Sequence, residues 1–175
     1  MRRPILVLAG LMLASPVLAQ SLSEKSGLNS LIGTAPSTAD FIKEAAISDM
    51  FEMQSSQLAA ERADEPTKKF ATKMIEDHQK TSTEMKAMVQ SGKVKAEIPT
   101  ALDSSHQSML DKLKGLNGAD FTKQYHSDQV KAHKDAVDLF QRYAKGGDND
   151  ELKAWAGKTE PALAEHLKMA QNLDK

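Results

Sequence analysis

Histidine side chains occupy positions in this sequence where a helix would be expected to carry apolar residues. Between Phe121 and Ala144 the apolar residues recur with the period of an α-helix, and His126 and His133 fall on the same stripe, seven residues apart. Imidazoles on such a stripe are expected to point inward. There they either bind a metal ion or remain neutral as hydrogen-bonded core residues.

The pattern recurs in three other long helical segments. Glu52 lies on the stripe that begins at Phe41, while His78 and His166 lie inside the apolar arcs of their own segments. Each segment thus supplies one inward group that could bind a metal: Glu52, His78, His133 and His166, with His126 as a further candidate. Three imidazoles and a carboxylate suit zinc, copper, iron or nickel. The open alternative is that all of them are satisfied core residues.

Capping and turn signals divide the chain into the helices that would position these groups. We expect long helices over residues 38–62, 66–90, 121–144 and 149–173, and a short helix over residues 104–114. At Pro161 we expect a kink in the last helix and one freed carbonyl, because proline lacks a backbone N–H group. No strand pattern is present. The expected fold is all-α, a four-helix bundle of two helical hairpins with a short extra helix in the connection between them.

The N-terminal residues resemble a secretory signal peptide. Arg2 and Arg3 precede an apolar run, and a small-x-small end at Val17–Ala19 predicts cleavage before Gln20. We therefore expect residues 1–19 to be a signal peptide, 20–36 a flexible leader and 37–175 the bundle domain, with export to the periplasm. The apolar run is too short to cross a bilayer, and without cysteine there is no lipid attachment point, so no stable membrane insertion is expected.

Composition limits the partners and the chemistry. The formal net charge is −1 and aromatic residues make up 5% of the chain, which argues against a nucleic-acid surface. The outward helical faces are largely charged, so a monomer or weak dimer is expected. No nucleophile motif, phosphate-binding glycine loop or nucleotide fingerprint is present, so we expect no catalytic or organic-cofactor residues and favour a protein that is not an enzyme.

Several short motifs resemble a known family. They are Asp77–His78 within MIEDHQKTSTEMKAM, the segment IPTALDSSHQSMLDKL, Tyr125, Gln129 and His133 with Leu139–Phe140, and Pro161 with His166–Leu167 and Met169–Ala170. Together they are similar to the bacterial family called domain of unknown function 4142, over about residues 38–173. The resemblance implies export, outer-membrane association in some members, and a ferritin-like fold. It implies no particular reaction.

The wider ferritin-like resemblance allows a comparison with di-iron sites, which use two lone glutamates and two Glu-x-x-His pairs. Glu52 matches one lone glutamate, and Gln129 stands where the second would be. His78 and His166 match the two histidines, but the residues three positions earlier are Ile75 and Leu163. One carboxylate of four is therefore present, which disfavours a di-iron site.

Three functions remain open from the sequence alone. The favoured one is an exported metal-binding bundle; the second is an envelope stress or interaction protein with structural histidines, and the least favoured is a ferritin-like oxidase. If His78, His133 and His166 are buried without metal, we expect burial to lower the pKa of each imidazole below 6.5, because desolvation disfavours the charged form.

Overall fold

The computed structural model describes residue 30 and residues 33–173. Five helices are defined within them: α3 (Thr38–Arg62), α4 (Glu65–Gln90), α5 (Ser104–Gly115), α6 (Gly118–Gly146) and α7 (Asp150–Asn172). This part of the chain contains no strand, which confirms the all-α prediction. The predicted signal peptide and most of the predicted leader lie outside the described residues.

Helices α3, α4, α5 and α7 each begin after a polar residue that caps the helix. In each case a side-chain oxygen accepts a hydrogen bond from a backbone N–H group in the first turn, which would otherwise lack a partner. The caps are Ser37 for α3, Asp64 for α4, Asp103 for α5 and Asn149 for α7. The predicted boundaries of these helices are therefore confirmed to within one or two residues.

Helix α7 continues on both sides of Pro161, as the predicted helix over residues 149–173 requires. A proline inside a helix removes one hydrogen bond to the carbonyl four residues earlier, here that of Gly157. Both residues are exposed, so the missing bond lies on the solvent side of the helix. The face that carries His166 continues past Pro161.

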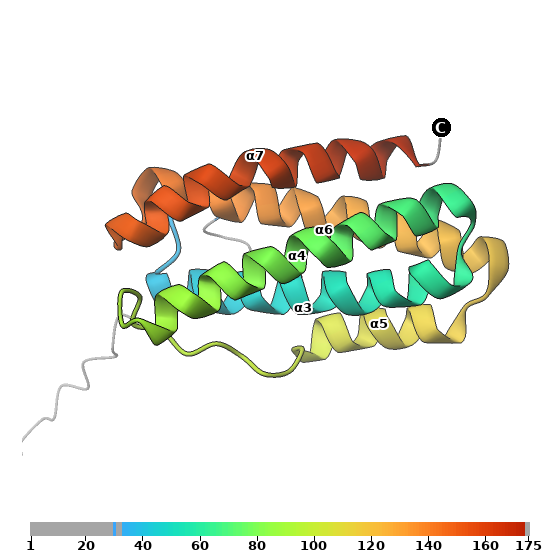
Figure 1. Cartoon of the computed structure of the whole chain (residues 1–175), viewed down its shortest axis with the longest axis horizontal. Helices are drawn as coiled ribbons and strands as arrows, with labels where there is room; N and C mark the ends of the chain where they lie inside the picture. The colour runs from blue at the N-terminus through green and yellow to red at the C-terminus, as the bar shows by residue number, and fades with distance from the viewer. Residues whose placement is uncertain (1–29, 31–32, 174–175) are drawn as a thin grey trace, which may run out of the picture.

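The four long helices lie side by side, and α5 runs along the outside of α3 (Figure 1). The closest packing is within the two hairpins, α3 against α4 and α6 against α7. Contacts of α3 with α6 and of α4 with α7 join the hairpins, and the α4–α7 seam is the sparser of these two joints. Each long helix therefore packs against two neighbours, and the inward faces of the four helices surround a common interior.

Two apolar clusters fill the interior, one toward each end of the long helices. One contains Phe41, Phe140 and Trp155, from the start of α3, the end of α6 and the start of α7. The other contains Phe51 and Tyr125, from the later part of α3 and the early part of α6. Each long helix also carries a buried polar residue where the stretches that build the two clusters meet. These residues are Glu52, His78, His133 and His166. The interior therefore has a polar layer near mid-length.

Candidate metal centre

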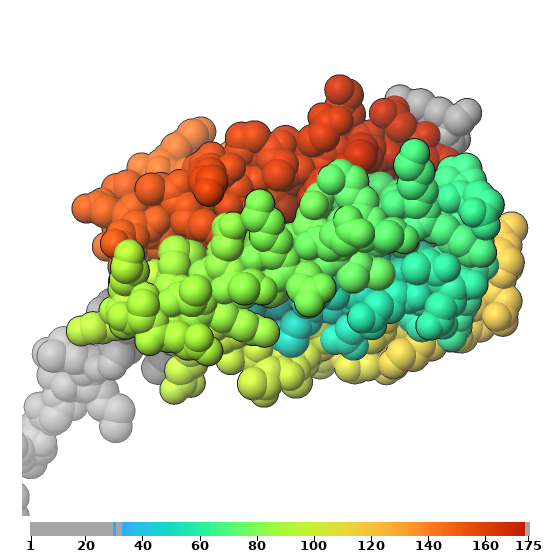
Figure 2. All heavy atoms as spheres, in the orientation of Figure 1, coloured from blue at the N-terminus to red at the C-terminus, as the bar shows by residue number. Residues whose placement is uncertain are grey.

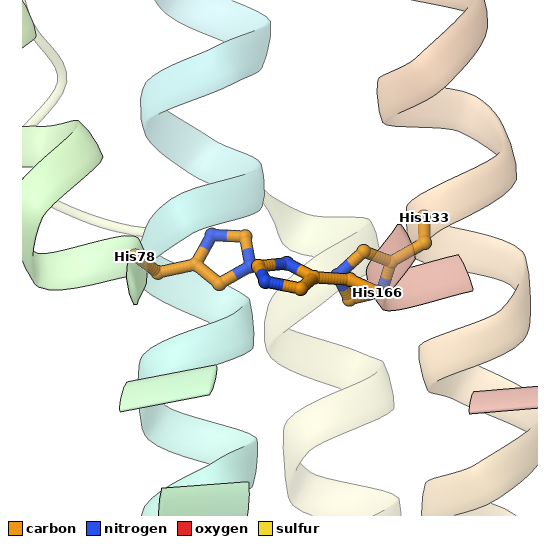
Figure 3. Close-up of side chains that lie close together, drawn as sticks. All are labelled: His78, His133 and His166. Carbon is orange, nitrogen blue, oxygen red and sulfur yellow. The ribbon is translucent and has the colours of Figure 1, made fainter. Parts of the chain in front are cut away.

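The polar layer brings together three of the predicted site residues. His78 of α4, His133 of α6 and His166 of α7 are buried, and each offers one ring nitrogen within 4.8 Å of the others. Their ring centroids lie 5.4–5.6 Å apart. Figure 3 shows the three imidazoles converging from their three helices. The helical period predicted one inward histidine on each of these three helices. The structure adds that the three histidines lie at the same depth in the interior.

Each of these imidazoles is held from behind through its other nitrogen. His78 Nδ1 lies 2.8 Å from Asp49 Oδ1, and His133 Nδ1 lies 2.9 Å from the backbone carbonyl oxygen of Gln129. His166 Nε2 lies 2.7 Å from Asp77 Oδ2. Since these oxygens can only accept, the nitrogens that face them carry the protons. A neutral imidazole then keeps a lone pair on its remaining nitrogen.

Those remaining nitrogens have no hydrogen-bond partner. His78 Nε2, His133 Nε2 and His166 Nδ1 are buried and unpaired among the described residues. A buried polar atom without a partner typically costs about 1–3 kcal/mol, and three at one place is uncommon in a folded core. Metal-binding histidines have this arrangement, with one nitrogen on the metal and the other donating to a carboxylate or backbone carbonyl.

The fourth predicted residue, Glu52, lies beside this group but outside it. Its carboxylate is 1% exposed, and Oε1 is 3.7 Å from His133 Nδ1, the nitrogen that already faces Gln129. Both carboxylate oxygens lack a hydrogen-bond partner among the described residues. Burial raises the pKa of Glu52 to about 7, against the lowering effect of the nearby His78 charge. Direct ligation by Glu52 remains a prediction.

His126, the further candidate, is buried elsewhere on α6. Its Nε2 lies 2.8 Å from Thr67 Oγ1 near the start of α4. Within the described chain, the group of residues whose ligand atoms converge does not include it. The stripe on α6 therefore carries two inward histidines with different surroundings, and His133 is the one at the level of His78 and His166.

Asp49 is the residue that the sequence analysis did not single out. It lies three residues before Glu52 and is buried, with Oδ1 on His78 and Oδ2 accepting from Ser82 Oγ at 2.9 Å. Ser82 follows His78 by four residues, so the two lie one turn apart on the same face of α4. That spacing was visible in the sequence, but the partner helix and its register were not.

The pKa values of the three histidines do not all move in the predicted direction. Burial and the charge of His78 lower the pKa of His133 to about 3, and burial together with the same charge lowers that of His166. Burial acts to lower the pKa of His78 as well, but the hydrogen bond and charge of Asp49 outweigh it and raise that pKa. The prediction of a lowered pKa is wrong for His78, because its acidic partner was not foreseen.

In the described part of the chain, no helix combines the length and the apolar character needed to cross a membrane. Two surface hollows, of about 850 and 780 Å³, are lined by residues other than the three histidines. The centre therefore lies apart from both of them.

Comparison with known proteins gives a family and no function. The sequence matches the family described as a domain of unknown function (DUF4142) over residues 25–173, which is most of the chain. No curated protein and no solved structure matches this chain. The resemblance drawn from Asp77–His78, His133 and His166 is thus confirmed at the level of the family: the chain belongs to the DUF4142 family.

Proposed function

We propose that this chain is an exported protein that binds one transition-metal ion through His78, His133 and His166. Two observations carry the proposal: one ring nitrogen of each histidine lies within 4.8 Å of the others, and each ring has one buried nitrogen without a hydrogen-bond partner. Support comes from the opposite nitrogens, each of which faces an oxygen acceptor at 2.7–2.9 Å. The architecture that we propose for the site is a four-helix bundle of the ferritin-like type, which builds metal sites from facing helices.

The donor set narrows the choice of metal. Zinc–imidazole bonds of about 2.0–2.1 Å place ligand nitrogens roughly 3.3–3.5 Å apart, so the three rings would move inward by a small side-chain adjustment. Three imidazoles suit zinc, copper, nickel or iron(II), while hard cations that prefer oxygen ligands are disfavoured. The carboxylates of Asp49 and Asp77 stand behind two of the rings and would offset the charge of a divalent ion.

Metal content of the purified protein tests this proposal. We expect protein from metal-replete cells to carry close to one zinc, copper, nickel or iron ion per chain, measured by elemental mass spectrometry. The double variant His78→Ala, His133→Ala should lose it. His126→Ala is the matched control, since it removes a buried histidine that lies outside the group, and it should keep the metal. Metal-free parent protein whose melting temperature does not change on metal addition would overturn the proposal.

The second function, an envelope stress or interaction protein with structural histidines, is favoured by one observation. The three rings already pack with their centroids 5.4–5.6 Å apart, a separation typical of aromatic packing in a core. In that case parent and double variant would contain the same background of metal. The unpaired nitrogens count against this function, because packing alone leaves them unsatisfied.

The ferritin-like oxidase is the least supported function. Gln129 is buried, and its amide donates to Ser55 Oγ at 3.3 Å where a second glutamate would be needed. Leu163 belongs to an apolar cluster, and Ile75 is half-buried. The carboxylates at this site lie behind or beside the imidazoles, at Asp49, Asp77 and Glu52, and do not reproduce the two Glu-x-x-His pairs and two lone glutamates of di-iron centres. Iron-dependent consumption of dioxygen by the purified protein would revive this function.

Export to the periplasm is part of the proposal and rests on residues 1–19. Their basic start, short apolar run and small residues at Val17 and Ala19 have the form of a cleaved signal peptide. We expect the intact mass of the protein recovered from the periplasmic fraction to correspond to a chain that begins at Gln20. A recovered chain that retains Met1 would contradict export by this route.

A further inference from the structure

We infer that the metal ion reaches the centre through the seam between α4 and α7, where Asp77 attracts the cation and Lys73 hinders it. This inference rests on the proposed metal-binding function. It concerns the route and the charges that control the rate of binding. The final ligands are the same three histidines.

The first observation is the weakness of this seam. The packing of α4 against α7 is sparse compared with the packing inside either hairpin. Side-chain hydrogen bonds cross it at two levels, from His166 to Asp77 at 2.7 Å and from Trp155 Nε1 to Glu84 Oε2 at 2.9 Å. Figure 2 shows α4 and α7 meeting along one face of the molecule. Small separations of the two hairpins are therefore easiest here.

The second observation is that only one of the three acceptors behind the imidazoles reaches solvent. The side chain of Asp49, behind His78, is 7% exposed, and Gln129, whose carbonyl lies behind His133, is fully buried. The side chain of Asp77, behind His166, is 37% exposed. Of the three acceptors, Asp77 is therefore the one that an ion arriving from solvent meets first.

The third observation is a cation already seated at Asp77. Oδ2 of Asp77 lies 2.7 Å from Lys73 Nζ and also 2.7 Å from His166 Nε2, so one oxygen serves both groups. The side chain of Lys73 is half exposed at the surface of α4. A hydrated divalent ion that approaches Asp77 must compete with this ammonium group. Removing the ammonium should speed capture, and removing the carboxylate charge should slow it.

The rate of cobalt(II) binding tests the inference. Cobalt(II) bound to histidines absorbs visible light, so stopped-flow mixing with metal-free protein gives the association rate directly. At low ionic strength we expect Lys73→Met to raise that rate several-fold and Asp77→Asn to lower it about tenfold. Both differences should shrink as salt is added, because the Debye length falls to about 10 Å at 0.1 M. A role of Asp77 in merely orienting His166 would not depend on salt.

A second pair on α6 provides the matched control. Lys131 and Asp135 form an exposed ion pair of the same spacing, with Nζ 2.6 Å from Oδ2, and neither touches the three histidines. Lys131→Met and Asp135→Asn should bind cobalt at the parental rate. At 1 M salt, where the loss of its charge is screened, Glu84→Ala removes the hydrogen bond to Trp155 and should speed both association and dissociation while leaving the dissociation constant unchanged.

The metal centre and its entry route are tested separately by these measurements. If the parent protein binds cobalt but Lys73→Met, Asp77→Asn and Glu84→Ala all show parental rates, the route through the seam is wrong and the metal centre stands. If the parent protein binds no cobalt, zinc, copper, nickel or iron, the proposed function fails and this inference fails with it.

Discussion

Replacing Glu52 with glutamine will raise the free energy of unfolding of the metal-free protein by about 3 kcal/mol at pH 8, and will change it little at pH 4. Glu52 is buried, and burial raises its pKa from 4.5 to about 7. Above pH 7 the folded protein must hold a buried charge that the unfolded chain holds in water. Below pH 4.5 the side chain is neutral in both states, and the penalty disappears.

The sign follows from proton binding. Between the unfolded pKa of 4.5 and the folded pKa of about 7, the folded protein binds more protons than the unfolded chain at this residue, so stability falls as pH rises. Glutamine has nearly the same shape and no charge, and therefore removes this dependence. The gain from the substitution should grow across that interval and level off above it.

Chemical denaturation at pH 4, 6 and 8 in the presence of a chelator measures the effect. Glu76→Gln, on the exposed side of α4, is the matched control for the chemical change itself. Equal gains for Glu52→Gln at all three pH values would show that the carboxylate is not desolvated. With metal bound, the gain should shrink, because a nearby cation stabilises the ionised form of Glu52.

The elements of this fold were predictable because their signals are local. A cap such as Asp64 or Asn149 acts on backbone N–H groups two or three residues away, and the helical period of 3.6 residues decides which face carries His78 or His166. Neither signal depends on the rest of the chain. The all-α class and the inward histidines could therefore be derived from the sequence alone.

The surroundings of the histidines could not be derived in the same way. Asp49 contacts His78 only because α3 and α4 align at one register, and a shift of one helical turn, about 5.4 Å, would separate them. Periodicity gives the angle of a residue around its helix and says nothing of its depth along a neighbour. This is why the pKa of His78 was predicted in the wrong direction, while that of His133, which faces a backbone carbonyl, was predicted in the right one.

His133 makes a contribution to the stability of the metal-free protein that is lost in acid, opposite in sign to the contribution of Glu52. Burial and the nearby His78 charge lower its pKa from 6.5 to about 3, so the folded protein keeps this imidazole neutral while the unfolded chain takes up a proton. Stability from this group is complete above the unfolded pKa and is lost as pH falls toward 3. Between pH 7 and pH 5 the loss from His133 alone amounts to about 2 kcal/mol.

The unfolding free energy of His133→Gln, relative to that of the parent protein, should therefore rise by about 2 kcal/mol between pH 7 and pH 5, on top of a constant cost for altered packing. His78→Gln should change the pH dependence of the unfolding free energy in the opposite direction. Because the pKa of His78 is raised in the fold, its protonation favours the folded state as pH falls toward 6.5, so the unfolding free energy of His78→Gln should fall relative to that of the parent protein. Urea unfolding at pH 7, 6 and 5 with a chelator present distinguishes the two variants. If the unfolding free energies of the parent protein and His133→Gln change in parallel with pH, His133 takes up protons equally in the folded and unfolded states. A buried, neutral imidazole at the centre of the polar layer is then ruled out.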